Sequence, residues 1–170
     1  MGEPMPVPDS AEIDDLARRV LDACRSRGLH LATAESCTGG LICGALTEIA
    51  GSSDVVACGF VTYDNAAKTR MLGVDAGLLA RLGAVCEPVA RAMAEGALAH
   101  APVDLTVAVT GIAGPGGGSA KKPVGLVHFA SARRDGPVHA EHHVFAGDRA
   151  AVRRQTVATA LRLLLDRATA

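Results

Sequence analysis

The chain has 170 residues, of which 49% are apolar, and a formal net charge of −1 at pH 7. This length predicts one domain with one core, and the near-neutral mixture of acids and bases argues against a general nucleic-acid or membrane surface. With no Trp, one Tyr and three Phe in the chain, the core must be built from aliphatic side chains.

The cysteines indicate the cellular compartment of the protein, and the N-terminal segment indicates where its domain begins. Five cysteines, with no CxxC pair, predict small core residues in a reducing, cytoplasmic compartment. No apolar run is long enough to span a bilayer, and the start of the chain has no signal-peptide pattern. We predict that the Pro-rich residues 1–8 form a disordered tail and that residues 9–168 form a single domain.

Helical and strand periodicities alternate along the chain. The first helix begins at a capping box, Asp9 with Glu12, and ends at Gly28. The short connection at 133–137 indicates that the last two strands form an antiparallel hairpin. This alternation predicts a three-layer α/β/α domain around a mixed, mostly parallel sheet of about five strands. The expected strands lie at 29–34, 55–63, 104–110, 124–132 and 138–145, and the helices at 9–28, 41–50, 64–72, 75–82, 87–100 and 149–167.

The segment Thr33–Gly40 joins the first strand to the second helix. A sharp turn there places Ser36 at the carboxyl end of the sheet, with the backbone N–H groups that open the helix directed at whatever Ser36 touches. This arrangement suits a nucleophile with an oxyanion hole, or a phosphate cradle. The alternative is a helix N-cap in a tight turn. The GxSxG signature of the α/β-hydrolases is not present.

A proton acceptor for Ser36 is offered by the segment that follows the second strand. If the first two strands are neighbours, Tyr63 and Lys68 approach Ser36. A lysine acts as a base only where burial or another cation lowers its pKa. Tyr63 could relay a proton or donate to a developing oxyanion. The alternative is a solvated lysine on a short helix and a tyrosine at a strand edge.

The most glycine-dense stretch, 110–119, follows a third strand. Its glycines let the backbone approach a ligand closely and present N–H groups to an anion. It matches neither the P-loop nor the Rossmann pattern, and a flexible surface loop is the alternative. Three strand-end loops carrying Ser36, Tyr63 and Thr110 are expected to converge on one crevice, where open α/β sheets bind ligands.

Two further groups of polar residues, three histidines and the arginines of the last helix, do not by themselves indicate a binding site. His139, His142 and His143 do not have a familiar metal-ligand spacing, so we predict no metal and no cofactor. On a strand, His139 and His143 would share one face and His142 the other. Arginines at the start of the last helix could include an anion contact, although a solvated helix face is the commoner arrangement.

Five segments together resemble the CinA C-terminal domain family. The resemblance runs from about residue 10 to residue 166 and implies a three-layer α/β/α fold with a five-stranded mixed sheet. It also implies a nicotinamide-nucleotide amidase, which converts nicotinamide mononucleotide to nicotinate mononucleotide and ammonia in pyridine nucleotide recycling. The segments are TAESCTGGL (Thr33–Leu41), GFVTYDNAAKTRMLGV (Gly59–Val74), GAVCEPVARAMAEGAL (Gly83–Leu98), AVTGIAGPGGGSAKKPVGLV (Ala108–Val127) and AGDRAAVRRQTVATAL (Ala146–Leu161).

Site roles follow from this resemblance residue by residue. It implies Ser36 as the nucleophile, Tyr63 and Lys68 as its assistants, and Arg149 near the substrate phosphate. On this hypothesis, backbone N–H groups around Thr38, Gly39 and Gly40 hold the oxyanion, and no metal is needed. The TGIAGP loop of the family falls on Thr110, Gly111, Gly114 and Pro115.

The chain departs from the family pattern at two positions. Cys86 stands where the family usually has serine, and Asp64 where it often has serine. Two other functions stay open: a ligand-binding module without turnover, and an interaction protein tied to DNA uptake or recombination. The near-neutral charge argues against direct DNA binding. We expect a homo-oligomer, since small α/β enzymes are frequently symmetric dimers.

Overall fold

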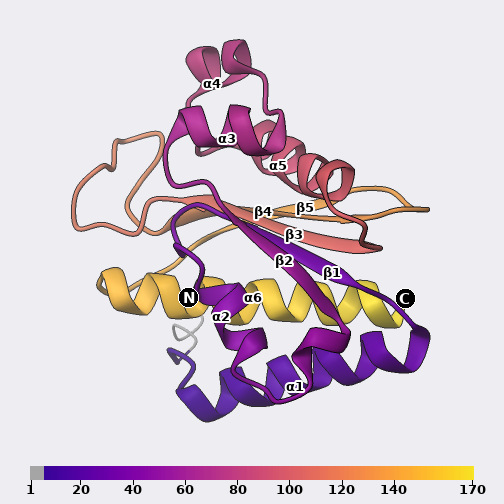
Figure 1. The fold of residues 1–170 in the computed structure, drawn as a ribbon. Coiled ribbons are helices and arrows are strands. Elements are labelled where there is room, and N and C mark those ends of the chain that lie inside the picture. Colours follow the sequence, from indigo (N-terminus) through magenta and orange to yellow (C-terminus); the bar gives the residue numbers. More distant parts are fainter. Residues whose placement is uncertain (1–5) are drawn as a thin grey trace.

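A five-stranded sheet is the middle layer of the computed structural model, which describes residues 6–170 (Figure 1). Its strands are β1 Leu31–Glu35, β2 Val56–Val61, β3 Leu105–Gly111, β4 Leu126–Arg133 and β5 His139–Val144, in the order β2-β1-β3-β4-β5. β1 pairs in parallel with β2 and β3, whereas β4 pairs antiparallel with β3 and β5. Within the described chain only β4 is reversed, which confirms the predicted mixed, mostly parallel sheet and its terminal hairpin.

Helices cover both faces of the sheet (Figure 1). They are α1 Ser10–Arg27, α2 Leu41–Thr47, α3 Asn65–Leu72, α4 Ala76–Leu82, α5 Glu87–His100 and α6 Arg149–Thr169. α1, α2 and α6 enclose one core with strand residues such as Val107 and Val109. α3, α4 and α5 enclose the other with small strand residues such as Ala34 and Ala108. The predicted three-layer α/β/α architecture is confirmed.

Local capping interactions set most helix ends where the sequence predicts them. Asp9 and Glu12 form the capping box of α1, and Gly28 ends that helix with a φ of 64°, in the left-handed region that favours glycine. The Asp64 side chain accepts a hydrogen bond from the Ala67 N–H at 2.6 Å and so caps α3. These bounds were predictable because each depends on residues within one helical turn.

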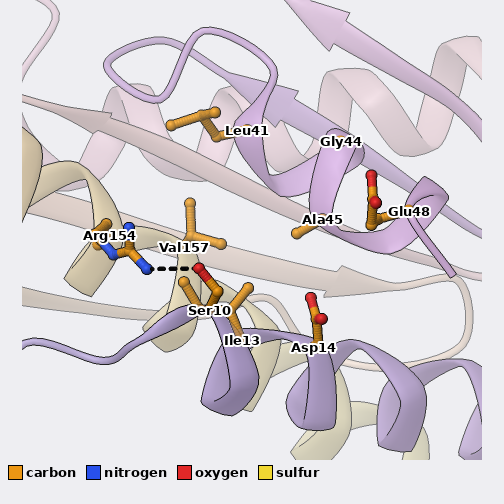
Figure 2. Close-up of a pocket in the computed structure, with 9 residues that line it drawn as sticks. All are labelled: Ser10, Ile13, Asp14, Leu41, Gly44, Ala45, Glu48, Arg154 and Val157. Carbon is orange, nitrogen blue, oxygen red and sulfur yellow. Dashed lines mark hydrogen bonds between the residues drawn. The ribbon is translucent and has the colours of Figure 1, made fainter.

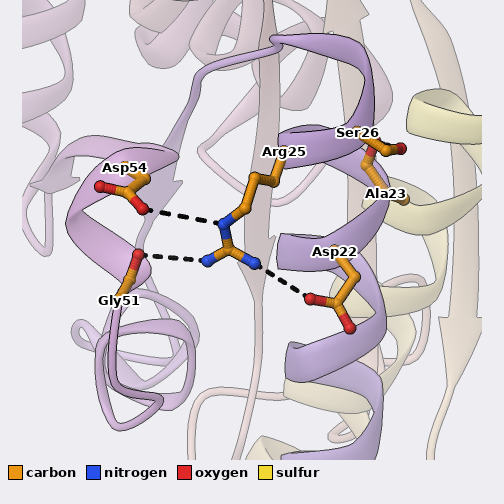
Figure 3. Close-up of polar contacts among 6 residues, drawn as sticks. All are labelled: Asp22, Ala23, Arg25, Ser26, Gly51 and Asp54. Carbon is orange, nitrogen blue, oxygen red and sulfur yellow. Dashed lines mark hydrogen bonds and ion pairs between the residues drawn. The ribbon is translucent and has the colours of Figure 1, made fainter.

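Arg25 on α1 fastens the loop between α2 and β2 (Figure 3). Its Nη2 donates to the Gly51 carbonyl at 3.2 Å, and its Nη1 donates to Asp22 Oδ1 at 3.0 Å. Its Nε lies 3.7 Å from Asp54 Oδ2. The loop expected at this point includes one turn of 3₁₀ helix, Ser52–Asp54, directly before β2. This contact therefore fixes the entry of the chain into the edge strand.

The N-terminal segment is described only from residue 6. Residues 1–5 of the predicted disordered tail lie outside the described residues. Pro8 is buried, and its carbonyl accepts a hydrogen bond from Arg154 Nε at 3.1 Å, so this end of the segment lies against α6. No helix within residues 6–170 has the length and apolar character that crossing a membrane requires.

Candidate active site

Ser36 lies at the carboxyl end of β1, in the turn that leads to α2. Its N–H donates to the Val109 carbonyl of β3 at 3.1 Å, and its carbonyl accepts from the Gly39 N–H at 3.0 Å. Gly39 and Gly40 have φ values of 57° and 104°, so both glycines allow the chain to reverse between strand and helix. The serine is consequently held on both sides by backbone hydrogen bonds.

Lys68 reaches Ser36 from α3. Its side chain is 1% exposed, and its Nζ donates to Ser36 Oγ at 3.0 Å and to the Thr62 carbonyl at 2.9 Å. Burial lowers the pKa of Lys68 below the ordinary lysine value, although the nearby Asp64 carboxylate acts in the opposite direction. A buried amine with a lowered pKa, in contact with a hydroxyl, is the arrangement that a serine nucleophile with a lysine base requires.

Glu35 is a site residue to which sequence reasoning assigned no role. Its side chain is fully buried on the α2 side of β1 and accepts hydrogen bonds from the Ile42 and Cys43 N–H groups at 2.9 and 3.0 Å. The expectation that the amides opening α2 face the ligand is therefore wrong for these two. A carboxylate just before a helix start is favourable there, and this preference was the available signal.

Thr38, Gly39 and Gly40 shape the turn and do not line the cavity described below. The Thr38 hydroxyl donates to Glu35 Oε1 at 2.6 Å, and the Gly39 N–H is already bonded to the Ser36 carbonyl. Arg153 of α6 adds a further constraint, because its guanidinium donates to the Cys37 and Thr38 carbonyls at 3.2 and 3.1 Å. A direct contact of these three turn residues with substrate stays a prediction.

A cavity of about 300 Å³ opens beside Ser36. The predicted convergence of three strand-end loops is confirmed, because the ends of β1, β2 and β3 all contribute to it. Asn65 and the α4–α5 loop residues Ala84 and Val85, to which sequence reasoning gave no role, also line it. Its volume suits a small molecule. The lining residues are Ser36, Cys37, Tyr63, Asn65, Lys68, Ala84, Val85, Thr110, Gly111, Ala113 and Arg149.

Arg149, at the first turn of α6, lines this cavity. Its Nη1 donates to the Gly114 carbonyl at 2.9 Å, and its Nη2 donates to the Tyr63 hydroxyl at 3.1 Å. Among residues 6–170 no carboxylate lies within 4.0 Å of this guanidinium, so its charge is uncompensated. Tyr63 is 61% exposed, and its hydroxyl makes no hydrogen bond to Ser36 or Lys68.

The third strand end shapes the cavity wall. The Thr110 hydroxyl donates to the Ala84 carbonyl at 2.9 Å and so holds the α4–α5 loop against the cavity. A Cβ at Gly111 would lie 2.7 Å from Val127 Cγ2, and one at Gly114 would lie 2.5 Å from Val124 Cγ1. Close packing thus accounts for glycine at these two positions.

Neither thiol near the site offers a nucleophile to this cavity, because the Cys37 thiol stays protonated and Cys86 does not line the cavity. Cys37 lines the cavity, but burial raises the pKa of its thiol to about 12, so the thiolate is not populated near neutral pH. Cys86 occupies the N-cap position of α5 and makes no side-chain cap; its Sγ lies 3.5 Å from the Gly83 carbonyl. The serine is therefore the nucleophile that this cavity offers.

The histidines of β5 contact different partners. His142 stacks on His128 with ring centroids 5.1 Å apart, whereas His143 packs against Phe145 with centroids 5.4 Å apart. His139 Nε2 lies 3.1 Å from Arg167 Nη1. Among the described residues, no three His, Cys, Asp or Glu side chains are grouped as metal ligands would be.

A second cavity, of about 290 Å³, lies between α1, α2 and α6 (Figure 2). Its walls include the apolar side chains of Ile13, Leu41 and Val157. Ser10 lies there, but its hydroxyl accepts a hydrogen bond from the charged Arg154 guanidinium at 3.1 Å, which offers no base. This cavity lacks the paired nucleophile and base that the Ser36 cavity has.

Comparisons with known proteins show the family to which the chain belongs. Residues 13–168 match the model of the CinA C-terminal domain. The chain is 50% identical over 154 residues, 91% of its length and 93% of the relative, to "Nicotinamide-nucleotide amidohydrolase PncC" of Escherichia coli K12. It is 56% identical over 137 residues, 81% of its length, to a "CinA-like protein" of Geobacter sulfurreducens, of which it covers 33%.

A solved structure has the same fold. The "competence/damage inducible protein CihA" of Agrobacterium tumefaciens superposes with a TM-score of 0.90 at 51% identity, covering 98% of both chains. Family match, sequence identity and fold agree over nearly the whole length. The chain belongs to the CinA C-terminal domain family.

Proposed function

We propose that this protein is a nicotinamide-nucleotide amidohydrolase, which hydrolyses the carboxamide of nicotinamide mononucleotide to nicotinate mononucleotide and ammonia. The name of the Escherichia coli relative, 50% identical over nearly the whole chain, supports this substrate. The observation that carries the proposal is the 3.0 Å contact between Lys68 Nζ and Ser36 Oγ at the cavity.

The first half of the reaction forms an acyl-enzyme. Neutral Lys68 takes the Ser36 proton as Oγ attacks the carboxamide carbon, and the carbonyl electrons move onto oxygen. The resulting ammonium of Lys68 then gives its proton to the amide nitrogen. The C–N bond breaks, ammonia leaves, and a nicotinoyl ester remains on Ser36.

The second half releases the acid. A water molecule loses a proton to Lys68 and attacks the ester carbon. The bond to Ser36 Oγ breaks, and the serine regains its proton from Lys68. The new carboxyl group loses its proton to solvent, and nicotinate mononucleotide leaves as a carboxylate. Lys68 thus acts alternately as base and acid, and the lowering of its pKa by burial favours the neutral form that the base role needs.

The developing oxyanion requires a backbone donor close to the nucleophile. The N–H of Cys37, the residue after Ser36, donates to no other described residue, and Cys37 lines the cavity. We place the oxyanion there, one residue before the predicted Thr38–Gly40 amides. Losing one such donor in comparable enzymes costs ~3 kcal/mol of transition-state stabilisation.

We assign the phosphate of the substrate to the part of the cavity that Arg149 lines. Arg149 supplies an uncompensated guanidinium there, and Tyr63 holds one of its nitrogens. We therefore give Tyr63 a positioning role toward Arg149, in place of the predicted assistance to Lys68, because its hydroxyl contacts neither Lys68 nor Ser36. No step in this mechanism needs a metal. The cytoplasmic location and the homo-oligomeric state stay predictions.

An ammonia-release assay with purified protein and nicotinamide mononucleotide tests the function. We expect one ammonia for each nicotinate mononucleotide formed. Ser36→Ala should abolish release while leaving the fold and nucleotide binding intact, and Ser26→Ala, an exposed serine on α1, is the matched control. Nucleotide binding by the unaltered protein without ammonia release would favour a non-catalytic binding module. Neither binding nor release would favour an interaction protein.

A further inference from the structure

Glu35 is a buried carboxylate that directly precedes the nucleophile and takes no part in the steps above. Each of its oxygens accepts two hydrogen bonds. Oε1 accepts from Thr38 Oγ1 at 2.6 Å and from the Ile42 N–H at 2.9 Å. Oε2 accepts from Thr33 Oγ1 at 3.1 Å and from the Cys43 N–H at 3.0 Å.

These four bonds fill the acceptor positions of a carboxylate. No position is left for a substrate or for a proton in transit, so Glu35 is not placed to act as an acid or base. The donors come from both sides of the turn, with Thr33 before Ser36 and the other three after it. The carboxylate therefore links the chain before Ser36 to the chain after it and holds the turn together.

The same residue is connected to Lys68 through its backbone. The Glu35 carbonyl accepts from the Thr62 N–H at 2.8 Å, and the Thr62 carbonyl accepts from Lys68 Nζ at 2.9 Å. Glu35 thus joins the turn that carries the nucleophile to the backbone group that fixes the amine. Ser36 and Lys68, 32 positions apart in the chain, meet next to this junction.

Helix α2 depends on this carboxylate as well. Its N-cap residue, Gly40, has no side chain to accept from the first amides of the helix, and Glu35 accepts from two of them instead. Without that acceptor, buried N–H groups would lose their partners, and the turn would be free to shift.

We propose that Glu35 is a positioning residue that sets the distance between Ser36 Oγ and Lys68 Nζ through the turn. This inference rests on the proposed amidohydrolase function. Since a misplacement of about 1 Å can reduce a rate by about 100-fold, loosening the turn should lower kcat. KM should stay unchanged, because the cavity residues that would contact the nucleotide are not altered.

The sharpest variant is Thr38→Val, which removes one donor to Glu35 with little change in shape. We expect kcat per folded molecule to fall by about 10-fold or more with an unchanged KM, and Thr38→Ser to restore kcat. Thr106→Val is the matched control. It removes another buried hydroxyl, which donates to the Ala94 carbonyl at 2.8 Å on the α5 side of β3, and it should lower stability without lowering kcat.

A second readout does not depend on the substrate. A fluorophosphonate forms a bond between phosphorus and Ser36 Oγ and expels fluoride, while Lys68 takes the serine proton, and mass spectrometry follows the rate. Thr38→Val and Glu35→Gln should both slow this labelling, whereas Thr106→Val should not. Glu35→Gln replaces one acceptor oxygen with an NH₂ group that faces the existing donors. Should Glu35→Gln fail to fold, the Thr38 variants still decide the question.

Specific outcomes overturn the inference. They are a folded Thr38→Val protein with the unaltered kcat and labelling rate, a rise in KM alone, or an equal loss of kcat in Thr106→Val. If the unaltered protein releases no ammonia but Ser36 is labelled, the proposed function fails while the labelling rates still test Glu35. If Ser36 is not labelled and no ammonia is released, both proposals fail.

Discussion

Lys68 Nζ lies 3.0 Å from Ser36 Oγ, and the lysine side chain is 1% exposed. Water therefore does little to stabilise its charge, so the neutral amine is populated at a lower pH than it would be in an exposed lysine. Two pH effects follow from this single contact, one on activity and one on stability.

The first prediction concerns the pH dependence of kcat/KM. Because only the neutral amine accepts the Ser36 proton, kcat/KM should fall as the pH drops through the lowered pKa of Lys68. This acidic limb should lie below the ordinary lysine value of about 10.4. Lys68→Arg should lose activity at every pH, because a guanidinium stays charged. Lys121→Arg, at an exposed position, should keep the original profile; an active Lys68→Arg protein would exclude lysine as the base.

The second prediction concerns the free energy of unfolding. The pKa of Lys68 is lower in the folded state, so the unfolded chain binds more protons between the two pKa values, and stability rises with pH in that window. Lys68→Met removes this titration. Its stability relative to the unaltered protein should be greatest below the folded-state pKa of Lys68 and should decline as pH approaches about 10.4. Urea unfolding across this pH range measures the slope, and parallel curves for the two proteins would contradict the prediction.

The third prediction assigns Arg149 to the substrate phosphate. Arg149→Ala should raise KM for nicotinamide mononucleotide by about 10- to 100-fold, since hydrogen bonds to charged groups are worth about 1.5–3 kcal/mol. Activity on nicotinamide riboside, which lacks the phosphate, should change little. Steady-state kinetics on both substrates makes the comparison, with Arg162→Ala on the exposed face of α6 as the control. An equal loss of activity on both substrates would show that Arg149 does not bind the phosphate.

The fourth prediction separates two roles for Tyr63. Its hydroxyl accepts from Arg149 and not from Lys68, so Tyr63→Phe should raise KM modestly and leave kcat within about twofold, because losing one hydrogen bond costs about 1 kcal/mol. The double variant with Arg149→Ala should be no worse than Arg149→Ala alone. A large fall in kcat with KM unchanged would instead indicate that Tyr63 takes part in proton transfer.

Local patterns in the sequence predicted much of this structure. Contacts between residues far apart in the chain could not be predicted from such patterns. The capped starts at Asp9 and Asp64 depend on nearby residues and were confirmed. The clamp of Arg153 on the Cys37 carbonyl joins positions 116 apart, which no local pattern reveals. Glu35 was missed for a related reason. Its partners are near in sequence, but its burial appears only once α2 folds back over β1.

The last prediction concerns Cys86, where the chain departs from its family. Cys86 holds the N-cap position of α5, with extended backbone angles and no side-chain cap, so amides in the first turn lack the acceptor that serine would provide. Cys86→Ser should therefore stabilise the protein by about 1 kcal/mol, the usual effect of a good N-cap residue. Thermal unfolding measures the change. Cys58→Ser, a half-buried thiol within β2, makes the same chemical substitution without a capping position and should give no gain. Equal effects at both positions would show that the loss of a thiol, and not the cap, determines the result.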